Sequence, residues 1–115
     1  LEALDLSLGR LLVGLKKAGG MAIITADHGN AEQMFERNKK TGDIIYNTNG
    51  RPKALTSHTL NAVPCTLFDP LNQCPAMLNP NFEAPGLANL ASTALELLGF
   101  QPPEEYKPSL LIAKT

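Results

Sequence analysis

The sequence has no excess of charge of either sign, and this limits the partners that it can attract. Its 115 residues include 10 Lys or Arg and 11 Asp or Glu, for a formal net charge of -1. A chain this close to neutral has no overall attraction for nucleic acid or for an anionic membrane surface. We therefore expect neither kind of partner, and any site for an anionic substrate must be local.

Paired cysteines and long apolar runs are also lacking. Cys65 and Cys74 are the only cysteines and form no CxxC pair. Nothing resembles a secretory signal or the run of about 20 apolar residues that spans a bilayer. We therefore interpret the two thiols as reduced and expect a cytoplasmic protein. With 43% hydrophobic and 18% charged residues the composition is that of a globular chain, so we expect one domain or part of one.

The pattern of apolar residues predicts a helix, a buried strand and a final helix. A stripe with helical spacing begins at Leu1, where no capping residue or initiator Met precedes it, so we expect the chain to begin inside a longer helix. The nearly continuous apolar run Met21–Thr25 is typical of a strand in a parallel sheet. A second helix is expected to end at Gly99. The two stripes consist of Leu1, Leu4, Leu8, Leu11, Leu12 and Leu15, and of Leu87, Leu90, Ala91, Ala94, Leu95 and Leu98.

The middle of the chain is less regular. We expect a short helix at residues 31–36, a small hairpin around Ile44–Tyr46, and a second strand at Val63–Phe68. The prolines at positions 70, 75, 80 and 85 are separated by unrelated residues, so we interpret this stretch as a loop punctuated by proline. Two strands between helices predict an α/β fold whose sheet edges need further neighbours.

The strongest chemical signal follows the first predicted strand, in the stretch Thr25–Glu32. Ligands of open α/β sheets gather beyond the carboxyl ends of strands, where Asp27 and His28 lie. A carboxylate oxygen beside an imidazole nitrogen suits manganese or zinc better than calcium, and Gly29 allows the chain to turn. The alternative is that Asp27 caps a following helix and His28 is an ordinary polar residue.

The only other histidine, His58, lies just before the second predicted strand. The fold can bring His28 and His58 together, because each flanks a predicted strand. Spacing alone, however, favours a lone loop histidine at this position.

Together these segments resemble the cofactor-independent phosphoglycerate mutases of the alkaline phosphatase superfamily. Residues 11–32 resemble that family's helix, strand and metal loop in order, residues 57–64 its second metal motif, and residues 86–99 its last helix. The Asp-His-Gly core is shared across the superfamily, whereas Asn30-Ala31-Glu32 joined to the second motif points to the mutases. The sequence departs from the family at Ala62, where proline is frequent, and residues 38–57 have no clear counterpart.

The resemblance implies a fold, an activity and a set of ligands. Residues 1–115 would form the C-terminal part of a three-layer α/β/α metal-binding domain, with no second domain. The family interconverts 3-phosphoglycerate and 2-phosphoglycerate in glycolysis through a phosphoserine, using two divalent ions, usually manganese. Asp27 and His28 match ligands of the ion that holds the nucleophilic serine, and His58 matches a ligand of the other ion.

The resemblance also implies what this chain lacks. Its four serines, Ser7, Ser57, Ser92 and Ser109, do not stand in the motif of the nucleophile, so we assign no catalytic residue here. We interpret the basic residues Lys39, Lys40, Arg51 and Lys53 as a solvated loop face. The parent is expected to be a monomer that acts on phosphoglycerate, and the isolated chain to be inactive and prone to self-association. The alternatives are a metal-dependent phosphatase or phosphodiesterase of the same superfamily, and a folded remnant without activity.

Overall fold

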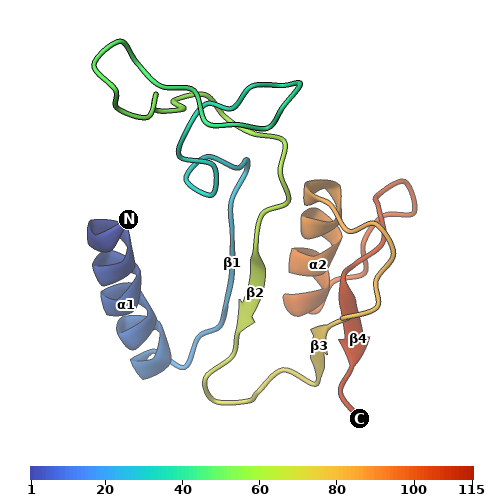
Figure 1. Ribbon diagram of the computed structural model, residues 1–115. Helices are drawn as coiled ribbons and strands as arrows, with labels where there is room; N and C mark the ends of the chain where they lie inside the picture. Colours follow the sequence, from blue (N-terminus) through green and yellow to red (C-terminus); the bar gives the residue numbers. More distant parts are fainter. The chain divides into compact units, whose positions relative to one another are not determined.

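The computed structural model describes residues 1–115, in which two helices, a 3-10 helix and four short strands are formed (Figure 1). None of the helices combines the length and apolar character needed to cross a bilayer. The chain divides into two compact units, which we call the terminal unit, Leu1–Ile24 with Cys65–Thr115, and the loop unit, Thr25–Pro64. The elements are α1 Glu2–Lys17, β1 Ala22–Thr25, β2 Cys65–Phe68, β3 Ala76–Leu78, η1 Leu87–Asn89, α2 Leu90–Leu97 and β4 Leu111–Ala113.

Helix α1 confirms the first predicted helix but not the burial of its apolar face. Acidic residues lie in its first turn and Lys16 and Lys17 in its last, as the helix dipole favours. Gly19 follows with a positive φ of 70° and ends the helix. No residue of α1 is buried, and Leu4 and Leu11 are each 67% exposed. The leucine stripe is therefore only partly covered, with Leu8, Leu12 and Leu15 at intermediate exposure.

Strands β1 and β2 confirm both predicted strands, although β2 begins at Cys65 and not at Val63. They pair in a two-stranded sheet, and Figure 1 shows that β2 runs opposite to β1. The expected parallel arrangement is therefore wrong for this pair. Parallel neighbours are usually joined by a crossover helix. Here no helix forms between β1 and β2, so the chain returns in the opposite direction.

A second sheet, formed by β3 and β4, was not predicted. The strands are antiparallel, with Ala76 opposite Ala113 and Leu78 opposite Leu111. Backbone hydrogen bonds continue the ladder at both ends, including one of 2.8 Å from Lys114 N to Pro75 O. The interpretation of this stretch as a loop was thus wrong in part. Each strand is only three residues long and carries no local pattern, so its pairing depends on a distant segment.

The last predicted helix is present as η1 and α2, and Gly99 follows it with a φ of 82°. Its buried face is not the one that periodicity indicated. Thr93 and Ser92 are almost fully buried, whereas Leu98 is 70% exposed. The Thr93 hydroxyl accepts a hydrogen bond of 2.9 Å from Leu110 N. The polar face of α2 therefore packs on the C-terminal segment and leaves most of the apolar stripe exposed.

Asp69 organises the turn after β2 and ties it to the end of the chain. Its carboxylate accepts hydrogen bonds from Cys74 N at 2.9 Å and Gln73 N at 3.0 Å, and lies 3.5 Å from Lys114 Nζ. These contacts, with the Cys74 N–H first, hold the pKa of Asp69 below its ordinary value of 3.8. The turn is thereby anchored to the residue that follows β4.

The loop unit contains three short segments paired by isolated antiparallel bridges. Ile45 N donates to Glu36 O, Glu36 N to Lys53 O, and Lys53 N to Ile45 O, at 2.8 to 2.9 Å, so the three segments close a ring of backbone hydrogen bonds. The expected hairpin is confirmed by the bridge between Arg37 and Ile44. The helix expected at residues 31–36 is wrong, because its end is extended and paired with the segment around Lys53.

Candidate metal centre

Within the loop unit the backbone brings the two histidine segments side by side. Gly29 and Thr59 form an isolated antiparallel bridge, with Thr59 N donating to Gly29 O at 2.9 Å and Gly29 N to Thr59 O at 3.3 Å. Each residue of this bridge directly follows one of the two histidines. The bridge therefore places His28 beside His58.

The two imidazole rings are stacked. Their centroids lie 3.5 Å apart and their planes are inclined by 12°. His28 Nε2 lies 3.6 Å from Asp27 Oδ1, and the Asp27 side chain is 89% exposed. No helix follows Asp27, so its alternative role as a helix cap is excluded. All three residues predicted from the sequence are thus gathered in one place.

The hydrogen bonding of His28 suits a metal ligand. Its Nδ1 lies 3.0 Å from the Gly29 carbonyl oxygen, so we assign the proton to Nδ1, which donates. Nε2, on the side of Asp27, then carries the lone pair. Histidine ligands of metals commonly donate their second ring N–H to a carbonyl in this way. Two ligand atoms of one tetrahedral ion lie about 3.4 Å apart, close to the observed separation of Nε2 and Oδ1.

The types of donor atom present suit a divalent cation, but there are too few of them to complete its coordination shell. No group of three or more His, Cys, Asp or Glu side chains converges with the geometry of a metal site. Closed sites for borderline cations use four or more donors. Asp27, His28 and His58 can therefore supply only part of the donors that such a site needs.

Glu32 links the two segments, a role that the sequence did not reveal. Its Oε1 accepts hydrogen bonds from the Thr59 hydroxyl and, at 3.0 Å, from Asn61 Nδ2. Its Oε2 accepts one of 2.6 Å from Asn30 N. These donors, above all the Thr59 hydroxyl, lower the pKa of Glu32 to about 2. Glu32 belongs to the first motif, and Thr59 and Asn61 belong to the second. Their spacing in the sequence does not indicate that these side chains are in contact.

Glycine is required at position 29 because there is no room for a side chain. A Cβ atom at this position would overlap both Thr59 Oγ1 and Glu32 Oε1. Its φ is not in the left-handed region, so the freedom to turn that the sequence suggested is not what the position uses. The absence of a side chain allows the backbone, the threonine and the glutamate to meet at one point.

The serines and basic residues do not form a second site. The Ser7 hydroxyl donates to Ala3 O within α1, and the Ser92 hydroxyl donates to Lys107 O. The basic residues Lys39, Lys40, Arg51 and Lys53 are all exposed, as expected for a solvated loop face. Lys53 also pairs with Glu36 at 2.9 Å.

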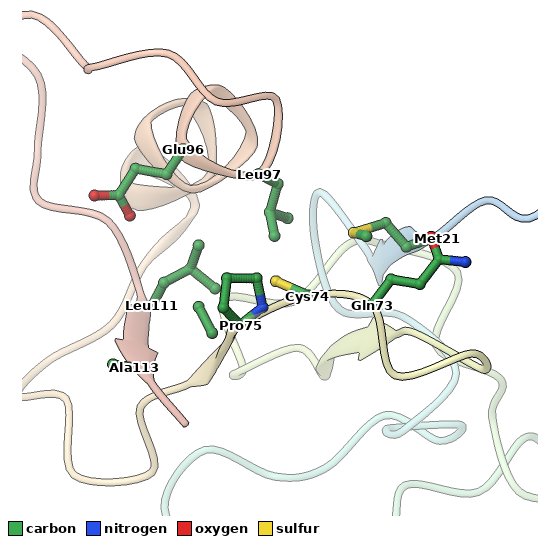
Figure 2. A pocket seen from close by; sticks show the side chains of 9 residues that line it. Met21, Gln73, Cys74, Pro75, Glu96, Leu97, Leu111 and Ala113 are labelled. Atoms are coloured by element: carbon green, nitrogen blue, oxygen red, sulfur yellow. The ribbon is translucent and has the colours of Figure 1, made fainter. Parts of the chain in front are cut away.

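The terminal unit contains a hollow of about 550 Å³ (Figure 2). The side chains of Met21 and Leu97 and the Cys74 thiol point into it, whereas the Glu96 carboxylate lies at its edge. Binding sites usually combine an apolar wall with a few convergent polar groups. In Figure 2 the Gln73 amide and the Glu96 carboxylate lie on opposite sides of the hollow, so its polar groups do not converge.

Comparison with known proteins decides the family. The model of the Metalloenzyme superfamily matches residues 1–102 of the chain. The chain belongs to the Metalloenzyme superfamily. This membership supports the resemblance drawn from the two motifs.

Several curated proteins with a named activity are similar to almost the whole chain. A probable 2,3-bisphosphoglycerate-independent phosphoglycerate mutase of Leptospira interrogans is 42% identical over 111 residues, and one of Arabidopsis thaliana is 39% identical over 110 residues. Each alignment covers 96% of this chain and 20% of the relative. The chain thus spans about a fifth of the length of these relatives.

A solved structure shows the same fold. The crystal structure of Leishmania mexicana phosphoglycerate mutase at low cobalt concentration is 40% identical, with a TM-score of 0.84. The alignment covers 98% of this chain and 20% of that chain. The expected fold, part of an α/β domain of the alkaline phosphatase type, is therefore confirmed.

Proposed function

We propose that this chain is the C-terminal part of a metal-dependent phosphoglycerate mutase. The whole protein would interconvert 3-phosphoglycerate and 2-phosphoglycerate through a phosphoserine intermediate, as a cytoplasmic, monomeric enzyme of glycolysis. The observation that carries the proposal is the stacking of His28 on His58 beside Asp27, in a chain 40% identical to a mutase of known structure. Residues 1–115 would all belong to its metal-binding domain.

Two divalent ions, manganese in our proposal, would be held in part by this chain. Asp27 and His28 would bind the ion that holds the serine nucleophile, and His58 would bind the other. When bound, such ions stabilise the charge of a phosphoryl group and activate an oxygen nucleophile. The residues of this chain orient the donors: the Gly29 carbonyl holds His28 Nδ1–H, which leaves Nε2 free on the side of Asp27.

The chain by itself is expected to be inactive. The nucleophilic serine and the groups that clamp the phosphate lie outside the motifs present here. Three donors divided between two ions leave each ion short of a closed shell. Catalysis therefore requires the remainder of the enzyme.

The test uses a full-length chain that carries this segment. Conversion of 3-phosphoglycerate is followed by a coupled enolase assay, and release of inorganic phosphate is measured in parallel. We expect isomerisation without net phosphate release, and we expect it to be lost when the protein is dialysed against a chelator and restored by manganese. Phosphate release without isomerisation would instead identify a phosphatase of the same superfamily.

A further inference from the structure

We propose that Glu32 is a positioning residue, whose carboxylate holds the His28 and His58 segments together so that the two imidazoles remain stacked. The inference rests on the proposed function for its significance, because the stacked histidines are the metal donors in that proposal. Its evidence is the set of contacts within the loop unit. Glu32 itself contacts neither ring and would act through the residues beside them.

The backbone link between the two segments is short. The two hydrogen bonds of the bridge between Gly29 and Thr59 are the only backbone hydrogen bonds between residues 27–33 and residues 57–61. The next one, from Leu55 N to Met34 O at 2.9 Å, lies beyond the turn that contains Glu32. A single isolated bridge leaves both loops able to twist about it.

The Glu32 side chain forms hydrogen bonds to both segments and so restrains them against this twisting. Toward its own segment it accepts a hydrogen bond from Asn30 N, and toward the other it accepts from the Thr59 hydroxyl and Asn61 Nδ2. Hydrogen bonds to an ionised carboxylate are about twice as strong as neutral ones. Thr59 is the neighbour of His58, so the carboxylate acts one residue away from that ring.

An ionised carboxylate suits this position better than an amide. A carboxylate offers two oxygen acceptors, whereas a glutamine side chain has one acceptor oxygen and an NH₂ group that only donates. Glu32→Gln would therefore keep an acceptor on only one side of the link and would replace hydrogen bonds to a charged group by weaker neutral ones. The space for the carboxylate exists because position 29 carries no Cβ.

The experiment compares the metal-free full-length protein that carries this segment with four single variants by proton NMR. The readouts are nuclear Overhauser effects between the ring protons of His28 and His58 and the ring-current shifts of those protons. Glu32→Gln and Thr59→Val are expected to lose both signals. Thr59→Ser, which keeps the hydroxyl, and Glu36→Gln, which removes a carboxylate paired with Lys53 in the same unit, are expected to keep them.

Persistent stacking in both Glu32→Gln and Thr59→Val would overturn the inference. Equal loss of stacking in Glu36→Gln would also overturn it, because the effect would then belong to any carboxylate of the loop unit. The pair Thr59→Val and Thr59→Ser separates a positioning effect from unfolding, since Val replaces only the hydroxyl of Thr by a methyl group, whereas Ser keeps the hydroxyl and loses the methyl group. The readout involves no metal and no phosphoglycerate, so its outcome is independent of the enolase assay that tests the mutase proposal.

Discussion

The rings of His28 and His58 lie stacked at 3.5 Å, although these residues come from opposite ends of the loop unit. The stack brings together two sequence motifs, neither of which identifies a metal site by itself. It depends on the adjacent bridge between Gly29 and Thr59 and on a carboxylate that joins the same two segments. Predictions about metal binding and about stability follow from these contacts.

Replacing Asp27 by Asn, or His28 by Ala, in a full-length chain is expected to abolish isomerisation with little change in fold. Asp27 is exposed and His28 is only half-buried, so these side chains serve the site and not a core. Activity is measured by the enolase assay and folding by circular dichroism. Asp43→Asn is the matched control, since Asp43 is an exposed carboxylate of the same unit. Wild-type activity in either site variant would contradict the assignment.

Replacing His58 by Ala is expected to lower the bound manganese by about one ion per full-length chain. Each ion needs several donors, and loss of an imidazole removes one that a borderline cation prefers. Inductively coupled plasma analysis of the dialysed protein reads the stoichiometry directly. If the metal content stays the same, His58 is an ordinary loop histidine.

The 115-residue chain alone is expected to show no turnover, to bind manganese weakly and to self-associate. Its donor set is incomplete, and Leu4, Leu6 and Leu11 of α1 are exposed to solvent. Calorimetric titration with manganese, the enolase assay and analytical ultracentrifugation measure the three properties. Submicromolar affinity, or turnover above a blank without protein, would show that the chain contains a complete site.

Substituting Gly29 by Ala is expected to destabilise the loop unit by about 1–3 kcal/mol, the usual cost of forcing a methyl group into filled space. The added Cβ would overlap the Thr59 hydroxyl and the Glu32 carboxylate. Gly9→Ala is the control. Gly9 lies in α1 with nothing near its Cβ position, so the change should stabilise that helix by about 1 kcal/mol. Hydrogen exchange of the Thr59 amide, which donates to Gly29 O, measures the change in the stability of the loop unit.

The contribution of Asp69 to stability is expected to disappear in acid. Its pKa is lowered in the folded state, so the unfolded chain binds more protons over the range between the two pKa values. The stabilisation is therefore present above the ordinary value of 3.8 and is lost as the pH falls through the lower, folded value. Asp69→Asn should be less stable than the wild type near neutral pH, and the gap should narrow in acid. Urea denaturation at several pH values measures the free energy of unfolding of both proteins. A difference between them that does not change with pH would contradict this role.

The segments that were predicted well carry their signals locally. Helix α1, β1 and the helix that precedes Gly99 follow from periodicity, from end charges and from glycines that adopt positive φ. The motif around Asp27 and His28 likewise stands out by its residue types, which are those that a metal site would use. These features depend on neighbours within a few positions, so the sequence alone determines them.

Other features were decided by the tertiary structure. The direction of β2, the pairing of β3 with β4 and the burial of Thr93 all depend on segments far apart in the chain. The same holds for the stacking of the two histidines and for the link through Glu32. A hydrogen bond or a ring contact between distant residues requires the backbone to bring them together first. The spacing of residues along the chain does not indicate which distant residues come into contact.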